Sequence, residues 1–210
     1  MSTQPCQQPS NAFREIAQFS RSHASATRLL YVATQDYSAA RCLALNLLIP
    51  SLVMGAQAAE KFLKSYLLLV NPSRNVRGLN HSLSRLLDEV DSHAPSLGFS
   101  RYRPLLERFE RHYGTRYPDN ANASTSMTTA DIRELDEFII LLNENLPCPF
   151  NVRYRSGLYA AITFSLQHGA VITPTERWIK EGNAALAPLL PRIAADYHAV
   201  MTALYPPIQL

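Results

Sequence analysis

Two lysines one helical turn apart are the first residues whose spacing points to chemistry. Residues 57–67 hold Lys61 and Lys64, and the only other lysine of the 210-residue chain is Lys180. Two ammonium groups on neighbouring turns attract a phosphate. Glu60 precedes Lys64 by four residues, the order that favours an ordinary ion pair on a helix. A phosphate site and a solvated helix face therefore both remain open.

A second pattern pairs arginine with histidine. Arg74 precedes His81 by six intervening residues, and Arg192 precedes His198 by five. Such a pair suits RNA cleavage without a metal, because the histidine moves a proton while the arginine stabilises the phosphate. Arg192 and His198 would point apart in a continuous helix, so Arg74 and His81 are the candidate catalytic pair. The ordinary alternative for His81 is a first-turn residue of a helix capped by Asn80.

Further candidate ligand-binding cations stand among aromatic residues. They are Arg111, Arg116 and Tyr117 within residues 101–117, and Arg153 and Arg155 on either side of Tyr154. Guanidinium groups among aromatic rings hold phosphates and stack bases in single-stranded RNA. The alternatives are a solvated helix face for the first group and salt bridges to the rest of the protein for the second.

Composition describes an ordinary globular protein. The 20 basic and 17 acidic residues give a net charge of +3, and 47% of residues are hydrophobic, which excludes a wholly disordered chain. The three cysteines, Cys6, Cys42 and Cys148, lie far apart without metal-ligand spacing. We therefore expect a cytoplasmic protein with no metal and no cofactor. The most apolar stretch, residues 42–59, contains proline and polar residues, so no membrane span is expected.

The spacing of apolar residues is helical through most of the first 147 residues. The predicted helices cover residues 11–30, 33–48, 51–70, 83–94, 102–113 and 129–146. Ser51 is the expected N-cap of the third, and Thr128 with Asp131 forms a capping box before the last.

Beyond residue 147 the pattern changes. In residues 150–155 apolar and polar residues alternate, which predicts a short extended segment with Arg153 and Arg155 on one side. Residues 159–166 fit a helix or a strand, and a final helix is expected from about residue 188 or 191. Trp178, the only tryptophan, is expected to dock this part of the chain onto the rest.

The predicted fold class is all-α, an up-and-down bundle of four to five helices with a C-terminal, mainly helical extension. The expected divisions are a disordered tail at residues 1–10, the bundle at 11–147 and the extension at 148–210. The first ten residues lack the basic start and apolar run of a secretory signal.

Four landmarks occur in order along the predicted bundle. They are Asp36-Tyr37-Ser38-Ala39-Ala40-Arg41, the segment 57–67, His81-Ser82-Leu83 with Leu86-Leu87, and Arg116-Tyr117-Pro118. Together they resemble the HEPN family of helical-bundle proteins over roughly residues 31–147. The resemblance implies a homodimer from a prokaryotic toxin-antitoxin or defence system. Many members of this family are metal-independent ribonucleases, and others bind nucleotides or RNA or partner a nucleotidyltransferase. In the ribonucleases an arginine is separated by four to six residues from a histidine, and it is this resemblance that implies a role for the spacing of Arg74 and His81.

Two hypotheses from different classes follow. The first is a HEPN-like protein that binds RNA or a nucleotide and acts as a metal-independent endoribonuclease if it is an enzyme. The second is a non-catalytic module that dimerises or docks a partner protein such as a nucleotidyltransferase.

Overall fold

The computed structural model describes residues 11–48, 50–79, 81–113, 127–169 and 171–205, and all regular structure in these ranges is helical. The first six helices are α1 (Asn11–Ser22), α2 (Ala24–Leu45), α3 (Ser51–Val70), α4 (Leu83–His93), α5 (Arg103–Tyr113) and α6 (Thr129–Glu144). They are followed by α7 (Phe150–Arg153), α8 (Leu158–Ile162), α9 (Phe164–Gln167), α10 (Pro174–Lys180) and α11 (Leu190–Leu204). Short 3-10 turns are η1 (Val76–Leu79), η2 (Pro95–Leu97), η3 (Phe99–Tyr102) and η5 (Ala187–Leu189). The all-α prediction is confirmed.

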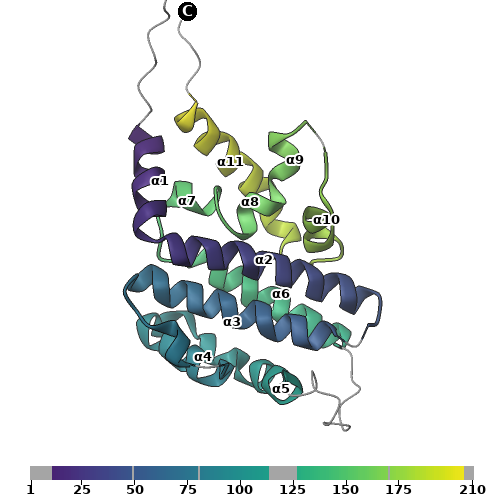
Figure 1. The fold of residues 1–210 in the computed structure, drawn as a ribbon. Coiled ribbons are helices and arrows are strands. Elements are labelled where there is room, and N and C mark those ends of the chain that lie inside the picture. The colour runs from purple at the N-terminus through teal and green to yellow at the C-terminus, as the bar shows by residue number, and fades with distance from the viewer. Residues whose placement is uncertain (1–10, 49, 80, 114–126, 170, 206–210) are drawn as a thin grey trace, which may run out of the picture.

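The helices α2 and α3 form an antiparallel hairpin at the centre of the molecule (Figure 1). On one side α4 and α5 pack against α3, and α6 contacts both helices of the hairpin. On the other side α8 and α10 pack against α2, so α2 lies between α3 and the C-terminal helices. Among the described residues, no helix is both long and apolar enough to cross a membrane.

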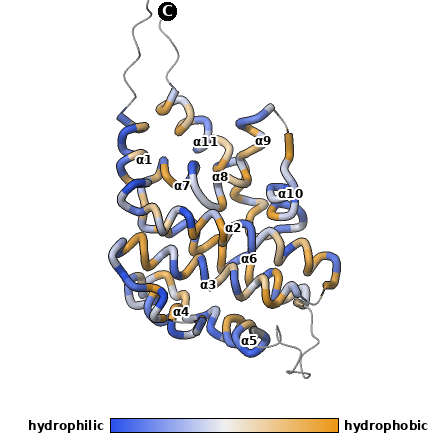
Figure 2. Tube along the Cα trace, viewed as in Figure 1, coloured by the Kyte–Doolittle hydropathy of each residue, from blue (hydrophilic) through white to orange (hydrophobic). Residues whose placement is uncertain are grey.

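Small residues let the central helices approach closely. Ala26, Ala33 and Ala40 recur every seven residues along α2, and all three are buried. Ala56 and Ala59 are buried on α3. Alanine adds no side-chain entropy cost in a helix and leaves room for a neighbouring backbone. Figure 2 shows hydrophilic residues along the outer edge of α4 and α5 and hydrophobic positions concentrated in the interior.

A buried arginine joins the helical bundle to the C-terminal helices. Arg41 of α2 is 1% exposed, and its guanidinium pairs with Asp136 of α6. Its Nε atom donates to the carbonyl of Trp178 at 2.8 Å, and Nη2 donates to the carbonyl of Glu181. The sequence predicts Trp178 as the docking residue, and the structure shows that its peptide carbonyl receives this contact. The ring itself lies under Arg177, whose guanidinium carbon is 5.1 Å from the ring centroid.

Tyr37 extends the same buried network. Its hydroxyl donates to Asp136 at 2.6 Å and accepts from Asn183 Nδ2 at 2.9 Å. Asn183 Oδ1 in turn accepts the backbone N–H of Leu186 at 3.0 Å. Burial, and after it the charge of Asp136, raises the pKa of Tyr37 well above its ordinary value, so the hydroxyl stays protonated as a donor.

The prediction of an extended segment at residues 150–155 is wrong. Residues Phe150–Arg153 form the single turn α7, and Pro149 is its N-cap. The rings of Phe150 and Tyr154 lie 5.2 Å apart, as expected for residues four apart on one helical face. Alternation over only six residues fits a strand and a helical turn equally well, so its period did not discriminate. Residues 159–166, whose sequence fits a helix or a strand, lie within the helical turns α8 and α9 and the residue between them.

The ends of the helices follow the predicted signals only in part. The capping box is confirmed, because Asp131 N–H donates to Thr128 Oγ1 at 3.1 Å and Thr128 N–H donates to Asp131 Oδ2 at 2.9 Å. Ser51 is the first residue of α3 and not its N-cap, since its hydroxyl accepts the N–H of Met127 at 3.0 Å. The N-cap of α4 is Ser82, which corrects the expected cap at residue 80, a position outside the described residues.

The boundary between the first two helices also differs from the predicted one. The break lies at His23, the N-cap of α2, and not between residues 30 and 33. Helix α2 therefore runs from Ala24 to Leu45, and its first two turns carry residues that the sequence assigned to the preceding helix.

Removing the carboxylate of Asp136 is expected to destabilise the protein strongly. The Asp136→Ala variant leaves the Arg41 guanidinium buried without its counter-charge, a change that costs about 3 to 5 kcal/mol of unfolding free energy. Urea denaturation followed by circular dichroism measures this loss. The control is Asp88→Ala, because the pair of Asp88 with Arg103 is exposed and contributes about 0 to 1 kcal/mol. Equal losses in the two variants would contradict the central role of Arg41.

The capping carboxylate of Asp131 should make the protein sensitive to acid. Burial raises its pKa, but hydrogen bonds from Thr128 and Arg108 outweigh this effect and hold the pKa below the ordinary value. Its stabilisation is therefore complete above the unfolded-state pKa of about 4 and is lost as pH falls through the lower folded-state pKa.

In Asp131→Asn the loss of stability on acidification is expected to be smaller than in the wild type. Urea midpoints compared at neutral pH and below about pH 4 measure the difference. Glu134→Gln, which removes a more exposed carboxylate that pairs with the same Arg108, should keep the acid sensitivity. An unchanged acid response in Asp131→Asn would exclude this carboxylate as its source.

Candidate functional site

A cavity of about 750 Å³ lies between the N-terminal half of α2, the middle of α3 and the loop that follows α3. Its volume falls in the range of small-molecule and cofactor sites. The cations of its wall are Arg28, Lys61, Lys64, Arg74 and Arg77. Glu60 is the single acidic residue among the described lining residues. Leu29, Val32 and Leu68 contribute apolar surface, so the cavity combines positive charge with hydrocarbon walls.

The two lysines are held in place by carboxylates. Lys64 Nζ lies 2.7 Å from Glu60 Oε1 one turn earlier on α3, the predicted pair, and the Glu60 side chain is only 9% exposed. Lys61 pairs with Asp36 of α2, and its Nζ also lies 3.4 Å from Gln57 Oε1. Both lysines are therefore ordered by neighbours on α2 and α3, and neither stands on a fully solvated helix face.

His81 is joined to the cavity wall through Glu60. Its Nδ1 atom lies 3.0 Å and 3.1 Å from the two carboxylate oxygens of Glu60. The His81 side chain is 63% exposed and stands before α4, which begins at Leu83. It is therefore not a first-turn helix residue. A carboxylate that orients one ring nitrogen is the arrangement that fixes the tautomer of a proton-transferring histidine.

The arginines of the cavity differ in their partners. Arg74 pairs with Glu89 of α4. Within the described part of the chain, no carboxylate lies within ion-pair distance of Arg28 or Arg77. These two guanidinium groups thus face the cavity region without a counter-charge.

The structure brings Lys61, Lys64 and Arg74 to one cavity and places His81 against the Glu60 that lines it. Arg111 is exposed on α5 and does not line this cavity. Arg155 lines a different cavity.

The remaining candidates are a capping residue, a pair on one helix, and two positions outside the described residues. Arg153 donates to the carbonyls of Glu144 and Leu146 and so caps the C-terminal end of α6. Arg192 pairs with Glu144, and it lies on the same continuous helix α11 (Leu190–Leu204) as His198, where a separation of six residues turns the two side chains about 240° apart. Arg116 and Tyr117 lie outside the described residues.

Sequence reasoning missed Arg28, which reaches the cavity from α2. The spacing of Ala24, Arg28 and Val32 puts them on one face of that helix, a signal that was available. The sequence does not say which helix this face meets, because that depends on packing between α2 and α3.

Comparison with protein-family models, with curated proteins and with solved structures gives no significant match to the chain. The assignment of a function therefore depends on the residues and contacts described above.

Proposed function

We propose that the protein binds a phosphorylated ligand, RNA or a nucleotide, in the cavity between α2 and α3, as a HEPN-like helical-bundle protein. The imbalance of charge carries this proposal. Five cations and one carboxylate, that of Glu60, line the cavity. Two further carboxylates, Asp36 and Glu89, pair with Lys61 and Arg74 from outside it. The cations therefore still outnumber the carboxylates, five to three. An anion of the phosphate type offsets this excess.

Arg28 and Arg77 are the groups best suited to hold the phosphate. Each offers a planar set of N–H donors that matches two phosphate oxygens, and neither has to leave a carboxylate to do so. Lys61 and Lys64 add positive potential while their own carboxylates keep them in place. The apolar wall, which includes Val32, suits the face of a sugar or base.

The Arg77→Ala variant tests the binding proposal. Arg77 is exposed on the 3-10 turn η1 that follows α3, so its removal should leave the fold intact. The loss of a charged hydrogen bond is worth about 1.5 to 3 kcal/mol, which corresponds to a roughly tenfold to hundredfold weaker affinity. Calorimetric titration with AMP and with a short RNA, at low and at physiological salt, measures it. Affinity should also fall as salt rises.

The matched control is Arg85→Ala. Arg85 is an exposed arginine of α4 that does not line the cavity. The Arg85→Ala variant should bind AMP and RNA as the wild type does. Equal losses in the two arginine variants would show that binding depends on general charge and not on this cavity.

A second candidate is metal-independent endoribonuclease activity, supported by the contact of His81 with Glu60. In this reaction the 2′-oxygen of the ribose attacks the phosphorus and the 5′-oxygen leaves. His81 would take the 2′-hydroxyl proton, with its ring oriented by Glu60, and Arg74 would stabilise the charge on the phosphate. Solvent supplies the proton that the 5′-oxygen needs.

The nuclease is tested by RNA cleavage in the presence of EDTA. Wild type should cut RNA, and His81→Ala should lose cleavage by about 10² to 10⁴-fold while it keeps its affinity for RNA. The exposed histidine of α11 supplies the control His198→Ala, which should cleave normally. Wild type that binds RNA without cutting it would exclude the nuclease and leave the binding proposal standing.

The toxin-antitoxin or defence setting and the homodimer stay predictions from the HEPN resemblance. So does the alternative in which the protein is a non-catalytic module for a nucleotidyltransferase. Protein that binds neither AMP nor RNA would favour that alternative.

A further inference from the structure

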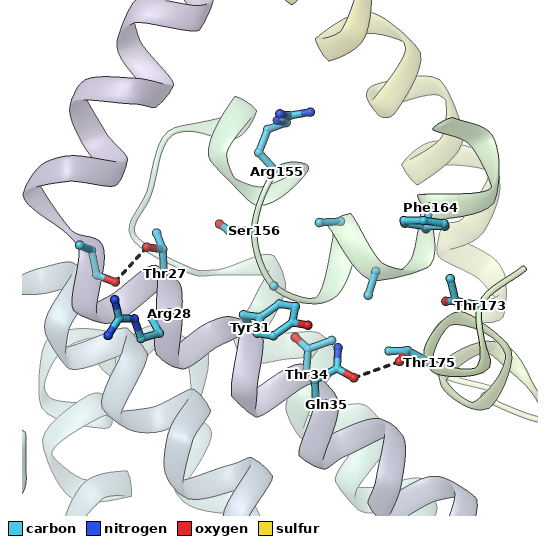
Figure 3. A pocket seen from close by; sticks show the side chains of 14 residues that line it. Thr27, Arg28, Tyr31, Thr34, Gln35, Arg155, Ser156, Phe164, Thr173 and Thr175 are labelled. Atoms are coloured by element: carbon cyan, nitrogen blue, oxygen red, sulfur yellow. Dashed lines mark hydrogen bonds between the residues drawn. The ribbon is translucent and has the colours of Figure 1, made fainter. Parts of the chain in front are cut away.

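A second cavity, of about 720 Å³, lies on the other side of α2 (Figure 3). It is enclosed by α2, the turn between α7 and α8, the helices α8 and α9, and the start of α10. Its described lining includes no acidic residue. The chemically distinctive side chains are Arg28, Arg155, Tyr31, Phe164 and Gln35.

Aromatic rings are the feature that separates this cavity from the first. Tyr31 comes from α2 and is 62% exposed although it lines a cavity. Phe164 comes from the α9 side, where its ring lies 4.1 Å from that of His168. Figure 3 shows Tyr31 and Phe164 on different walls of the same space. An exposed ring with an open face is a surface on which a nucleobase stacks.

Polar groups near Tyr31 offer donors to a base. Thr175 donates its hydroxyl proton to Gln35 Oε1 at 3.0 Å, the bond drawn in Figure 3. This bond leaves the Gln35 NH₂ group as a donor, with no acceptor among the described residues. An amide beside an aromatic ring can both stack and hydrogen-bond a base.

The turn between α7 and α8 is held close to α2. Gly157 has a φ of +77°, and a Cβ built there would lie 3.3 Å from Leu30 Cβ. Both the left-handed conformation and the close approach favour glycine. The neighbouring Ser156 and Arg155 therefore line the cavity from this turn.

Arg28 connects the two cavities. It lines both of them, as does Ala24 one turn earlier on α2. In Figure 3 its guanidinium is turned away from the Tyr31 ring. Arg28 therefore lies where the linings of the two cavities meet.

We propose that one single-stranded RNA chain spans both cavities, with its backbone in the lysine-lined cavity, a phosphate at Arg28 and a base stacked on Tyr31. This inference rests on the proposed function and names its ligand as RNA and not a mononucleotide. The division of chemistry supports it, because the described lining of the first cavity holds five cations and no aromatic ring, whereas the second adds aromatic rings and neutral donors beside Arg28 and Arg155. A mononucleotide fills only one of the two spaces.

The test compares a short oligoadenylate with AMP. Tyr31→Ala should weaken binding of the oligoadenylate about tenfold or more, the loss of one base–aromatic stack, and leave the affinity for AMP unchanged. Tyr31→Phe should restore oligoadenylate binding, since it keeps the ring. Arg28→Ala should weaken both ligands. Tyr205→Ala, which removes a tyrosine 55% exposed at the end of α11, is the matched control and should change neither.

The outcomes separate this inference from the function on which it rests. If AMP binds and Tyr31→Ala leaves oligoadenylate affinity unchanged, the spanning chain is wrong and the phosphate site stands. If Tyr31→Ala weakens AMP equally, Tyr31 belongs to a mononucleotide site and the spanning chain is again wrong. If wild type binds neither ligand, both proposals fail. Thermal unfolding of each variant confirms that it is folded.

Discussion

The buried guanidinium of Arg41 is the constraint on which the rest of the structure depends. A charge removed from water is tolerated only when a counter-charge and hydrogen-bond acceptors replace the solvent. The counter-charge comes from Asp136 of α6, and the acceptors are carbonyls at the end of α10. One side chain of α2 therefore requires that α6 lie on one side of this helix and α10 on the other. The position of α2 at the centre of the molecule follows from this requirement.

The same constraint shapes the second cavity. With α10 held against α2 by Arg41, the start of α10 lies beside the middle of α2, where Thr175 bonds Gln35 and its carbonyl accepts from the Ser38 hydroxyl at 3.4 Å. These contacts close one end of the cavity, and the turn at Gly157 limits the other side. The N-terminal half of α2 contributes Arg28 and Tyr31 to the lining between these two limits.

Local signals in the sequence predicted most helices because periodicity and caps act within a few residues. The capping box at Thr128 and the Glu60–Lys64 pair are of this kind. The partners of Arg41 are 95 to 140 residues away, so no spacing rule could have found them. The contact of His81 with Glu60 depends in the same way on how α4 is brought back to α3. The prediction of an extended segment at residues 150–155 failed for the opposite reason, since its pattern was too short to define a period.

Two of the three lysines of the chain line the first cavity, but on the binding proposal they are not the cations that contact the phosphate. Each lysine of the chain stands beside a carboxylate: Lys61 beside Asp36, Lys64 beside Glu60, and Lys180 beside Glu176. A phosphate that takes one of these lysines must compete with a carboxylate already in place, and the exchange of one anion for another gains little. On the binding proposal, arginines without such a partner would bind the phosphate at no such cost. The proposal therefore assigns the phosphate contacts to Arg28 and Arg77, and the lysines would set the electrostatic potential around them.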